Sequence, residues 1–500
     1  MSTGLPLRDA PAPERVEPDL VNRRPRAAAV AGIPFIVALI CGAWATGRPS
    51  LWSDELVTVD VAGRSVPQIM RLLGHVDAVH GLYYLLMHPL VEHLGISAAV
   101  VRAPSVLATA IAAAALGILG RVLMTPVAGL LAGVVYALTP VASQYALEAR
   151  SYALVTAIAV LACLAFTLAL RGGRPIAFAS YTALLVLLGA MHLFALLLVS
   201  AHVVTVLACL AARRLSWRRA LAWAACVVAA VPALAPLAKV ARSESGAVEW
   251  IRPPDAAHLW ISVLGVAGGP AATLLVVLLI AVAIAIAIAV RRMTTMLMVV
   301  LPWAFVPLVA LLALSQLQPL FVPRYLLFCI PAVALLVAAG LTSGPRPLMI
   351  VVGCALLALT VPAQAELRRP DSKWHDVTPI VRALSREGRP GDRYLVAPAN
   401  TRLLASAYPK VFGPMIDVAQ AKTGAATGTL TGREVGTREL LRRLRTADRV
   451  WVVERLNGDR KVRERARARI ALLDKAGITR VVERRHAKNM RLALHVREKP

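Results

Sequence analysis

The chain has 500 residues, of which 58% are hydrophobic and 17% are charged, and its mean hydropathy is +0.67. Soluble domains contain about 45–50% apolar residues, so this composition excludes a wholly soluble protein and indicates a polytopic membrane protein. The formal net charge is +27. Residues 366–500 hold 31 Lys and Arg against 15 Asp and Glu, and the other basic residues lie mostly in short loops between apolar blocks. This distribution argues against a nucleic-acid partner.

A helix that crosses a membrane needs about 20 consecutive apolar residues, and the sequence contains eleven such blocks. The predicted spans are residues 27–46, 100–120, 126–143, 151–170, 175–192, 193–212, 219–238, 271–290, 294–314, 326–343 and 347–364. The segment before them is polar, rich in proline and without the apolar core of a signal peptide. We therefore predict a disordered cytoplasmic tail at residues 1–26 and a transmembrane domain at residues 27–364.

The charges between the spans predict the orientation. The loops after the second, fourth, sixth, eighth and tenth spans carry arginine and no acidic residue. Loops rich in Lys and Arg stay in the cytoplasm, so we predict a multi-pass protein of a bacterial plasma membrane with a cytoplasmic N-terminus. The loop at 47–99, the loop at 239–270 and the chain after residue 365 then lie outside. All membrane-proximal carboxylates face that side.

After residue 365 the pattern becomes that of a soluble domain. Strand-like runs at 393–398, 449–455, 478–485 and 491–496 alternate with helical segments, which predicts a small α/β extracytoplasmic domain at 365–500. Its many arginines are typical of a solvated basic surface. Contact with anionic lipid headgroups or cell-wall polymers is the alternative.

The first outer loop, residues 47–99, is unusually polar for its place in the chain. Asp54 and Glu55 follow Trp52 directly after the first span, and Asp77 lies close to a tyrosine pair. One interpretation is a loop of interfacial helices, because "VPQIMRLLGHV" and "HGLYYLLMHPLVEHLG" carry apolar residues at helical spacing. The other is a catalytic loop, because a carboxylate at the membrane surface can remove a proton from a hydroxyl acceptor.

Five segments resemble, in the right order, glycosyltransferases of the GT-C superfamily. They are "WSDE", "VDAVHGLYYLLMHPL", "VRAPSVL", "ALTPVASQYALEARSYAL" and "PRYLLFCIPAVALL". The chain is most similar to family 39-like enzymes, which include protein O-mannosyltransferases and bacterial lipid A aminoarabinose transferases. The resemblance covers roughly residues 27–390, since "RRPDSKWHDVTPIVRAL" is similar to the segment that often follows the last span in bacterial members.

This resemblance implies transfer of a sugar from a polyprenyl-phosphate donor to a lipid, glycan or protein of the cell envelope at the outer face, with inversion at the anomeric carbon. The choice of mannose or another hexose or pentose rests on family analogy alone. The resemblance also implies that Asp54 is the catalytic carboxylate, with Glu55 and Asp77 as further acids of the site. The candidate substrate-binding residues are His80, Tyr83, Tyr84, Glu148, Arg150, Tyr152, His192, Arg324 and Tyr325.

Several of these residues have a second interpretation. Arg150 and Arg324 are candidate phosphate ligands because guanidinium presents a planar fork of donors. Arg150 could instead pair with Glu148 to anchor a helical hairpin, and Arg324 could be an interfacial arginine. Arg102 is predicted to anchor the second span. His192 either caps a helix at the interface or faces the site.

The sequence requires no cofactor, since it lacks HExxH, CxxC, GxGxxG and P-loop motifs and its six cysteines lie in or beside spans. A divalent metal held by Asp54, Glu55 and Asp77 is an alternative. A membrane transporter or lipid flippase is the main alternative function. Ion-coupled transporters carry ionisable residues inside the bundle, whereas the interiors of the predicted spans contain no Asp, Glu, Lys or Arg. A non-catalytic assembly scaffold would not need adjacent carboxylates beside a phosphate ligand.

Overall fold

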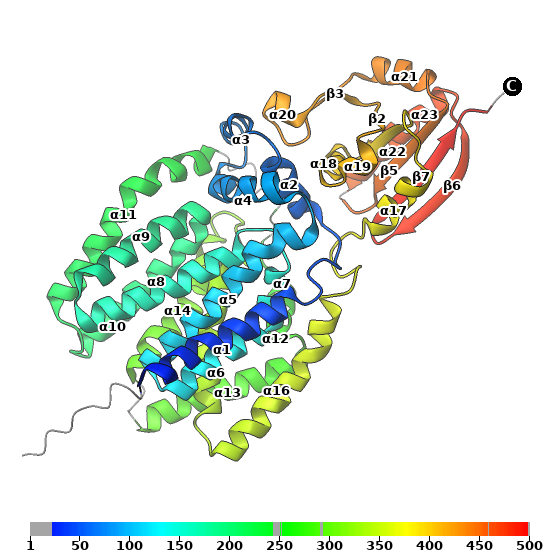
Figure 1. Ribbon diagram of the computed structural model, residues 1–500. Helices are drawn as coiled ribbons and strands as arrows, with labels where there is room; N and C mark the ends of the chain where they lie inside the picture. The colour runs from blue at the N-terminus through cyan, green and yellow to red at the C-terminus, as the bar shows by residue number, and fades with distance from the viewer. Residues whose placement is uncertain (1–22, 244–250, 252, 291–293, 459, 499–500) are drawn as a thin grey trace, which may run out of the picture.

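The computed structural model describes residues 23–243, 251, 253–290, 294–458 and 460–498. Long helices form a bundle that leads into a mixed α/β region at the C-terminus (Figure 1). This confirms the predicted combination of a polytopic helical fold with a small α/β region. Most of the predicted N-terminal tail, residues 1–22, lies outside the described residues.

Each of the eleven predicted spans coincides with a helix or a helix pair. In the described chain, eight helices are long and apolar enough to cross a membrane, a bent pair is a ninth candidate, and two apolar helices are shorter. The elements are α1 (Arg23–Ala43), α5 (Ala98–Leu123), α6 with α7 (Pro126–Leu138, Pro140–Ala146), α8 (Tyr152–Gly172), α9 (Pro175–Met191), η2 with α10 (Leu193–Leu197, Leu198–Ala211), α11 (Trp217–Ser243), α13 (Pro270–Val290), α14 (Thr294–Leu314), η4 with α15 (Pro323–Cys329, Ile330–Leu341) and α16 (Arg346–Glu366).

The third predicted span is not one straight helix. The axes of α6 and α7 differ by 61° at the break before Pro140. Proline has no N–H to donate, and its ring clashes with the preceding turn, so the prediction of a continuous helix at 126–143 is wrong. Gln364 Nε2 of α16 donates to the Leu138 carbonyl oxygen at 2.8 Å and satisfies one acceptor that the break exposes.

Glycines allow three helices in the bundle to approach closely. A Cβ atom at Gly117 of α5 would lie 2.3 Å from the Val30 carbonyl oxygen of α1, and one at Gly120 would lie 2.7 Å from Cα of Gly129 in α6. Small residues let membrane helices pack at such short range. α8 is 78% buried within the structure and α16 only 11%, so α8 is central and α16 is peripheral.

The predicted outer loop at 47–99 consists of short helices. They are α2 (Ser53–Ala62), α3 (Val66–Leu73), η1 (Ala78–His80) and α4 (Gly81–Leu94). α3 and α4 are the two segments with predicted helical spacing, whereas α2, which contains the acidic pair, was not predicted. Figure 1 shows this layer between the bundle and the C-terminal sheet, and α2 contacts α4 on one side and α18 (Leu403–Ala407) on the other.

The C-terminal region is built around a five-stranded sheet of order β2–β1–β5–β7–β6. The strands are β1 (Arg393–Ala397), β2 (Ile416–Asp417), β5 (Arg449–Arg455), β6 (Arg480–Ala487) and β7 (Met490–Val496). β1 pairs in parallel with β2 and β5, whereas β7 pairs antiparallel with β5 and β6. All four predicted strands are therefore confirmed, and only β2 was missed in this sheet.

Helices surround the sheet, and several short elements connect it. The three predicted helical segments appear as α17 (Thr378–Glu387), α21 (Thr437–Arg445) and α22 with α23 (Arg460–Ile470, Leu472–Lys475). Besides α2 and β2, the sequence did not predict α12 (Ala256–Ala267), which contacts α7 and α13 of the bundle. Around the sheet it also missed η5 (Ala399–Arg402), α18, α19 (Pro409–Phe412), β3 (Gln420–Lys422), α20 (Gly424–Thr427) and β4 (Arg433–Glu434).

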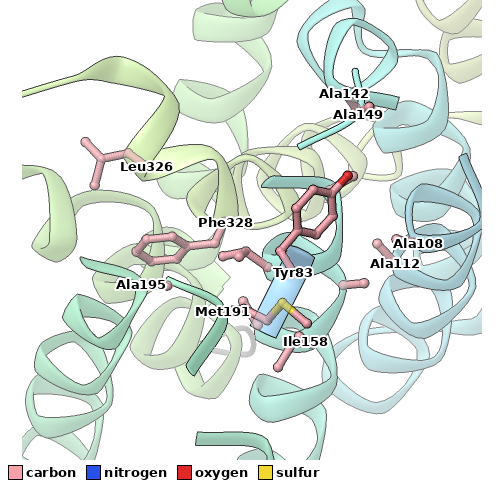
Figure 2. Packing of buried hydrophobic residues seen from close by; sticks show 14 of the residues in the cluster. Tyr83, Ala108, Ala112, Ala142, Ala149, Ile158, Met191, Ala195, Leu326 and Phe328 are labelled. Atoms are coloured by element: carbon pink, nitrogen blue, oxygen red, sulfur yellow. The ribbon is translucent and has the colours of Figure 1, made fainter. Parts of the chain in front are cut away.

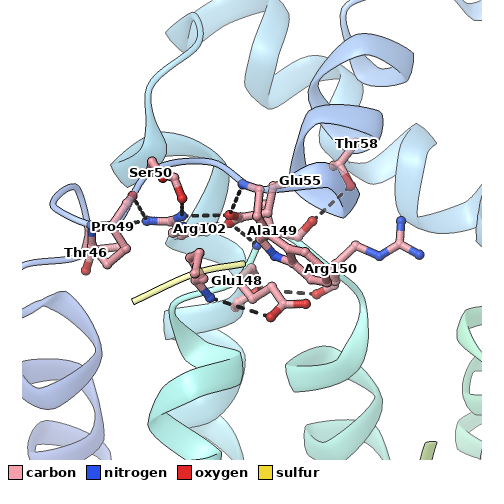
Figure 3. A network of polar contacts seen from close by, with 12 residues as sticks. Thr46, Pro49, Ser50, Glu55, Thr58, Arg102, Glu148, Ala149 and Arg150 are labelled. Carbon is pink, nitrogen blue, oxygen red and sulfur yellow. Dashed lines mark hydrogen bonds and ion pairs between the residues drawn. The ribbon is translucent and has the colours of Figure 1, made fainter. Parts of the chain in front are cut away.

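A buried ion pair fixes α2 to the bundle. The side chains of Glu55 and Arg102 are both 0% exposed, and Nε and Nη2 of Arg102 each donate to a carboxylate oxygen at 2.7 Å. The remaining N–H groups donate to the carbonyl oxygens of Thr46, Pro49 and Ser50 (Figure 3). Burial by itself raises the pKa of Glu55, but the Arg102 guanidinium outweighs burial and holds that pKa below its usual value. The predicted anchoring role of Arg102 is confirmed.

Arg102→Met removes the guanidinium but keeps a long unbranched side chain. It leaves a buried carboxylate without its counter-charge, which costs about 3–5 kcal/mol. We expect a lower midpoint of thermal unfolding in detergent, and partial recovery in the Arg102→Met/Glu55→Met double variant. Arg369→Gln, whose side chain is 59% exposed, is the control and should leave the midpoint unchanged. A wild-type midpoint for Arg102→Met would contradict the anchoring role.

Candidate active site

Asp54 lies in the first turn of α2, and its carboxylate meets an arginine from η4. Oδ2 of Asp54 is 3.4 Å from Nη1 of Arg324, and the two side chains are 27% and 22% exposed. The structure therefore brings the candidate catalytic carboxylate together with one candidate phosphate ligand. The pair remains accessible from the surrounding cavities.

Aromatic rings surround Arg324. Its guanidinium carbon lies 5.7 Å from the ring centroid of Tyr152, at the distance of a cation–π contact. The ring centroid of His192 lies 4.9 Å from that of Tyr325 and 5.9 Å from that of Tyr152. Three candidate substrate-binding residues thus form one aromatic group beside Arg324.

Arg150 belongs to a second polar group, formed with η1 and α4. Its Nη2 donates to Nε2 of His80 at 2.9 Å. Burial, followed by the positive charge of Arg150, holds the pKa of His80 well below its usual value. His80 is therefore neutral, and the 3.7 Å distance between its Nε2 and Oδ1 of Asp77 is not an ion pair. The other carboxylate oxygen of Asp77 accepts a hydrogen bond from the hydroxyl of Tyr84.

Glu148 does not pair with Arg150, which was the alternative role considered for the two residues. Its Oε2 lies 3.6 Å from Nζ of Lys373, in the segment after α16, and the two side chains are 4% and 10% exposed. Burial raises the pKa of Glu148 to about 7, although Lys373 opposes that shift. Glu148 is therefore a carboxyl group that changes its charge near neutral pH.

Two predicted site residues do not join these groups. The carboxylate of Glu55 turns to Arg102 and also accepts hydrogen bonds from the backbone N–H groups of Ala149 and Trp52 at 2.9 Å and 3.3 Å. Tyr83 is 1% exposed, and Figure 2 shows its ring among packed apolar residues. The contacts of Glu55 are those of a structural residue, whereas the buried hydroxyl of Tyr83 has no hydrogen-bond partner among the described residues.

Lys373 is a candidate that the sequence analysis missed. It stands in "RRPDSKWHDV", directly after the last span, and that segment contributed to the family resemblance. In the local sequence, its position next to Trp374 was the only feature that could have indicated a functional role. Its role as the partner of Glu148 depends on a contact between segments that are far apart in the chain.

Two cavities meet at Trp52, which lines both. The cationic cavity has an empty volume of about 620 Å³ and is lined by Trp52, Gln144, Tyr145, Leu147, Glu148, Arg324, Leu367, Ser372, Lys373 and Trp374. The sheet-side cavity has an empty volume of about 720 Å³ and is lined by Asp54 and its neighbours in α2 together with residues of the C-terminal region. The Asp54–Arg324 pair therefore joins the two cavities.

An apolar cavity of about 1110 Å³ lies among α6, α13, α15 and α16. Its lining includes Ile330, which also lines a small neighbouring cavity. Tyr145 lines both that small cavity and the cationic cavity. Each cavity therefore neighbours the next through one shared lining residue, in the order from the apolar cavity beside α16 to the cationic cavity of Arg324 and Lys373.

The three carboxylates considered as metal ligands do not converge. Glu55 is held by Arg102, and Asp77 accepts from Tyr84. Within the described ranges, no group of three or more His, Cys, Asp or Glu side chains is arranged to hold a metal ion. The residues present therefore do not fit the oxygen-ligand site that the sequence suggested.

Neither a family model nor a curated protein matches this sequence, but solved structures match its fold. ArnT from Cupriavidus metallidurans in the apo state has a TM-score of 0.63 at 13% identity, over 93% of this chain and 97% of that chain. ArnT bound to undecaprenyl phosphate has a TM-score of 0.64 at 13% identity, over 93% of this chain and 98% of that chain.

Two further structures match at lower scores. The arabinofuranosyltransferase AftD from Mycobacteria has a TM-score of 0.52 at 16% identity, over 95% of this chain and 40% of that chain. The archaeal oligosaccharyltransferase AglB from Archaeoglobus fulgidus, in complex with an inhibitory peptide and a dolichol-phosphate, has a TM-score of 0.52 at 10% identity, over 87% of this chain and 70% of that chain. The likeness shows that this chain has the same polytopic membrane fold as ArnT.

Proposed function

We propose that this protein is an integral-membrane glycosyltransferase that uses a polyprenyl-phosphate sugar. The observation that carries this proposal is the order of the groups along the cavities, which runs from the apolar bundle to Arg324 and Lys373 and then to Asp54. A lipid-linked donor has the same order of apolar tail, anionic phosphate and sugar. The structures of ArnT bound to undecaprenyl phosphate and of AglB with a dolichol-phosphate share this fold.

Arg324 and Lys373 are the proposed ligands of the donor phosphate. Guanidinium supplies a planar pair of donors, and lysine supplies a compact charge. Arg324 pairs with Asp54 at 3.4 Å, so a phosphate that binds Arg324 would compete for this contact and release the Asp54 carboxylate. The neighbouring group of Asp77, His80 and Arg150 offers donors and acceptors for the hydroxyls of the sugar.

Asp54 is the proposed general base. It takes the proton of the acceptor hydroxyl while the hydroxyl oxygen forms a bond to the anomeric carbon. The bond between that carbon and the phosphate oxygen breaks, its electron pair leaves with the lipid phosphate, and Arg324 and Lys373 stabilise the resulting charge. Attack opposite the leaving phosphate inverts the anomeric carbon.

The proposed orientation follows the arginine-rich loops and places the N-terminus in the cytoplasm. α2 and the C-terminal sheet lie at the same end of the bundle (Figure 1), so this orientation puts the whole site at the outer face of the membrane. The proposed sugar is a hexose such as mannose, or a pentose. The acceptor belongs to the cell envelope.

Asp54→Asn keeps the size of the side chain but removes its basic lone pair. A general base contributes about 10² to 10⁴-fold, so the transfer rate should fall by that factor while donor binding persists. The measurement uses purified protein in lipid, a panel of radiolabelled polyprenyl-phosphate sugars and a membrane extract. Asp371→Asn, at a side chain that is 47% exposed, is the control. A near-normal rate for Asp54→Asn with an inactive Asp77→Asn would transfer the role of the base to Asp77.

Lys373→Gln and Arg324→Gln should each raise the KM for the donor. A hydrogen bond to a charged group contributes about 1.5–3 kcal/mol, which corresponds to a rise of roughly 10- to 150-fold. The KM is measured by varying the lipid-linked sugar at a fixed amount of membrane extract. Arg346→Gln, at the start of α16, controls for the loss of one positive charge. Unchanged donor KM values for both variants would contradict the phosphate assignment.

Glu148 should make donor binding dependent on pH. Below its pKa of about 7 it is neutral, so Lys373 and Arg324 act on the phosphate at full charge; above that pH its carboxylate offsets them. The donor KM should therefore rise by about fivefold or more as the pH increases through 7. Glu148→Gln should abolish this rise, because the phosphodiester of the donor does not titrate in that range. An identical pH profile for Glu148→Gln and the wild type would show that another group titrates.

A further inference from the structure

The sheet-side cavity has two walls. α2 and the residues just before it provide one wall, and the C-terminal region provides the other. Hydrogen bonds link the two segments on either side of the cavity; for example, Ser50 Oγ donates to the carbonyl oxygen of His375 at 2.8 Å, and Arg64 Nη2 donates to that of Thr429 at 2.9 Å. Asp54 therefore faces a cavity that the transmembrane bundle cannot form alone.

Three side chains of the C-terminal wall carry buried polar atoms without a hydrogen-bond partner among the described residues. The atoms are Oγ1 of Thr401, Nδ1 of His375 and Nε of Arg455. Thr401 and His375 are only 4% and 6% exposed. Buried polar groups in proteins are nearly always hydrogen-bonded, so three unsatisfied atoms on residues that line one cavity are available to bind a ligand there.

The hydrogen bond at Nε2 of His375 determines whether its other ring nitrogen, Nδ1, donates or accepts. Nε2 of His375 lies 2.9 Å from Oδ1 of Asn457, an oxygen that only accepts. Nε2 therefore carries the proton, and burial favours the neutral imidazole by lowering the pKa of His375. Nδ1 is then an acceptor, suited to a hydroxyl group of a ligand.

Among the described residues that line the cavity, Arg455, at the end of β5, is the one charged residue of the C-terminal wall. Its Nη1 lies 3.5 Å from Oγ of Ser53, the residue before Asp54. Nearby arginines of the sheet region are neutralised, since Arg402 pairs with Asp417 and Arg449 with Asp392. In the part of the chain that the structure describes, Arg455 has no such carboxylate partner. A half-buried cation beside an apolar cavity favours an anionic ligand.

We propose that the sheet-side cavity binds the acceptor, and that this acceptor is an anionic amphiphile whose reacting group is a hydroxyl. This inference rests on the glycosyltransferase function proposed above. Most of the cavity lining is apolar, including Leu51, Leu56, Leu403 and Met490, which matches a lipid portion better than a free glycan. The anionic group, a phosphate or a carboxylate, pairs with Arg455.

Placing the acceptor in the sheet-side cavity also gives roles to the other polar residues that line it. Thr401 and His375 bind hydroxyls of the acceptor headgroup, and Asp54, which lines the same cavity, takes the proton of the reacting hydroxyl. The acceptor oxygen forms its bond to the anomeric carbon as the lipid phosphate leaves with the electron pair of the broken bond. Arg455 contacts the acceptor away from the reacting atoms, so its loss should affect KM for the acceptor more than kcat.

The test uses the full chain in lipid nanodiscs with radiolabelled polyprenyl-phosphate sugars. A membrane extract is separated by anion exchange into neutral and anionic lipid fractions, and a water-soluble glycan fraction is kept. Label should move from the donor into the anionic lipid fraction. Arg455→Gln should raise the amount of that fraction needed for half-maximal rate by about 10- to 100-fold, with a smaller change in the maximal rate. Arg455→Lys should recover part of the loss.

Two further variants complete the design. Thr401→Val keeps the shape of the side chain and should raise the same half-saturating amount by about 3- to 10-fold. Arg484→Gln, at an exposed position of β6, controls for the loss of one positive charge and should match the wild type. Hydrolysis of the donor without acceptor is measured for every variant, and an unchanged rate in Arg455→Gln shows that the donor site is intact.

The possible results separate this inference from the proposed function. Transfer of label only to neutral lipids or to soluble glycans would overturn the inference, as would wild-type half-saturation for both Arg455→Gln and Thr401→Val. Failure of the wild type to release label from any donor would instead overturn the glycosyltransferase proposal. Phosphatase treatment of the anionic fraction narrows the identity of the anion: lost acceptor activity assigns a phosphate monoester, and retained activity assigns a phosphodiester or a carboxylate.

Discussion

The placement of the candidate site depends on the buried pair of Glu55 and Arg102. Two charges that are 0% exposed are stable only because each is fully hydrogen-bonded: all five N–H groups of Arg102 have acceptors, and Glu55 also accepts from two backbone amides. The pair ties α2 to α5. The hydrogen bond from Ala149 also ties α2 to the turn at 147–151, between α7 and α8. Successive residues of a helix point about 100° apart, so fixing Glu55 directs the adjacent Asp54 elsewhere, into the cavities.

The ion pairs of the candidate site differ from this structural pair in geometry. Arg102 holds Glu55 at 2.7 Å through two donors, whereas the Arg324–Asp54 and Lys373–Glu148 distances are 3.4 Å and 3.6 Å. Longer, single contacts hold their partners less firmly. Arg324 and Lys373 therefore each have a carboxylate partner that a phosphate can displace. The displaced groups have uses: Asp54 becomes available as a base, and Glu148 can take up a proton.

The sequence predicted the features that follow from local composition. Apolar length marked all eleven spans because the hydrocarbon core imposes it, and alternation of apolar residues marked the strands β1, β5, β6 and β7. The bend at Pro140 was missed because the span was assigned from the length of its apolar block, which does not show where a helix breaks. Only the family resemblance distinguished Asp54 from Glu55. The sequence could not reveal the structural role of Glu55, or single out Lys373 and Arg455, because these roles depend on contacts between segments that are far apart in the chain.

The division of the site between bundle and sheet has a chemical consequence. A transferase must let a hydroxyl reach the anomeric carbon while keeping water, which is also a nucleophile, away from it. The bundle forms the apolar cavity and contributes to the cationic cavity together with the segment at 367–374. The C-terminal region closes the far side of Asp54 with apolar residues such as Leu403, Leu404 and Met490. An amphiphile that fills this second cavity would expel water from the carboxylate at the moment it presents its hydroxyl. On this argument, the C-terminal region favours transfer over hydrolysis as well as selecting the acceptor.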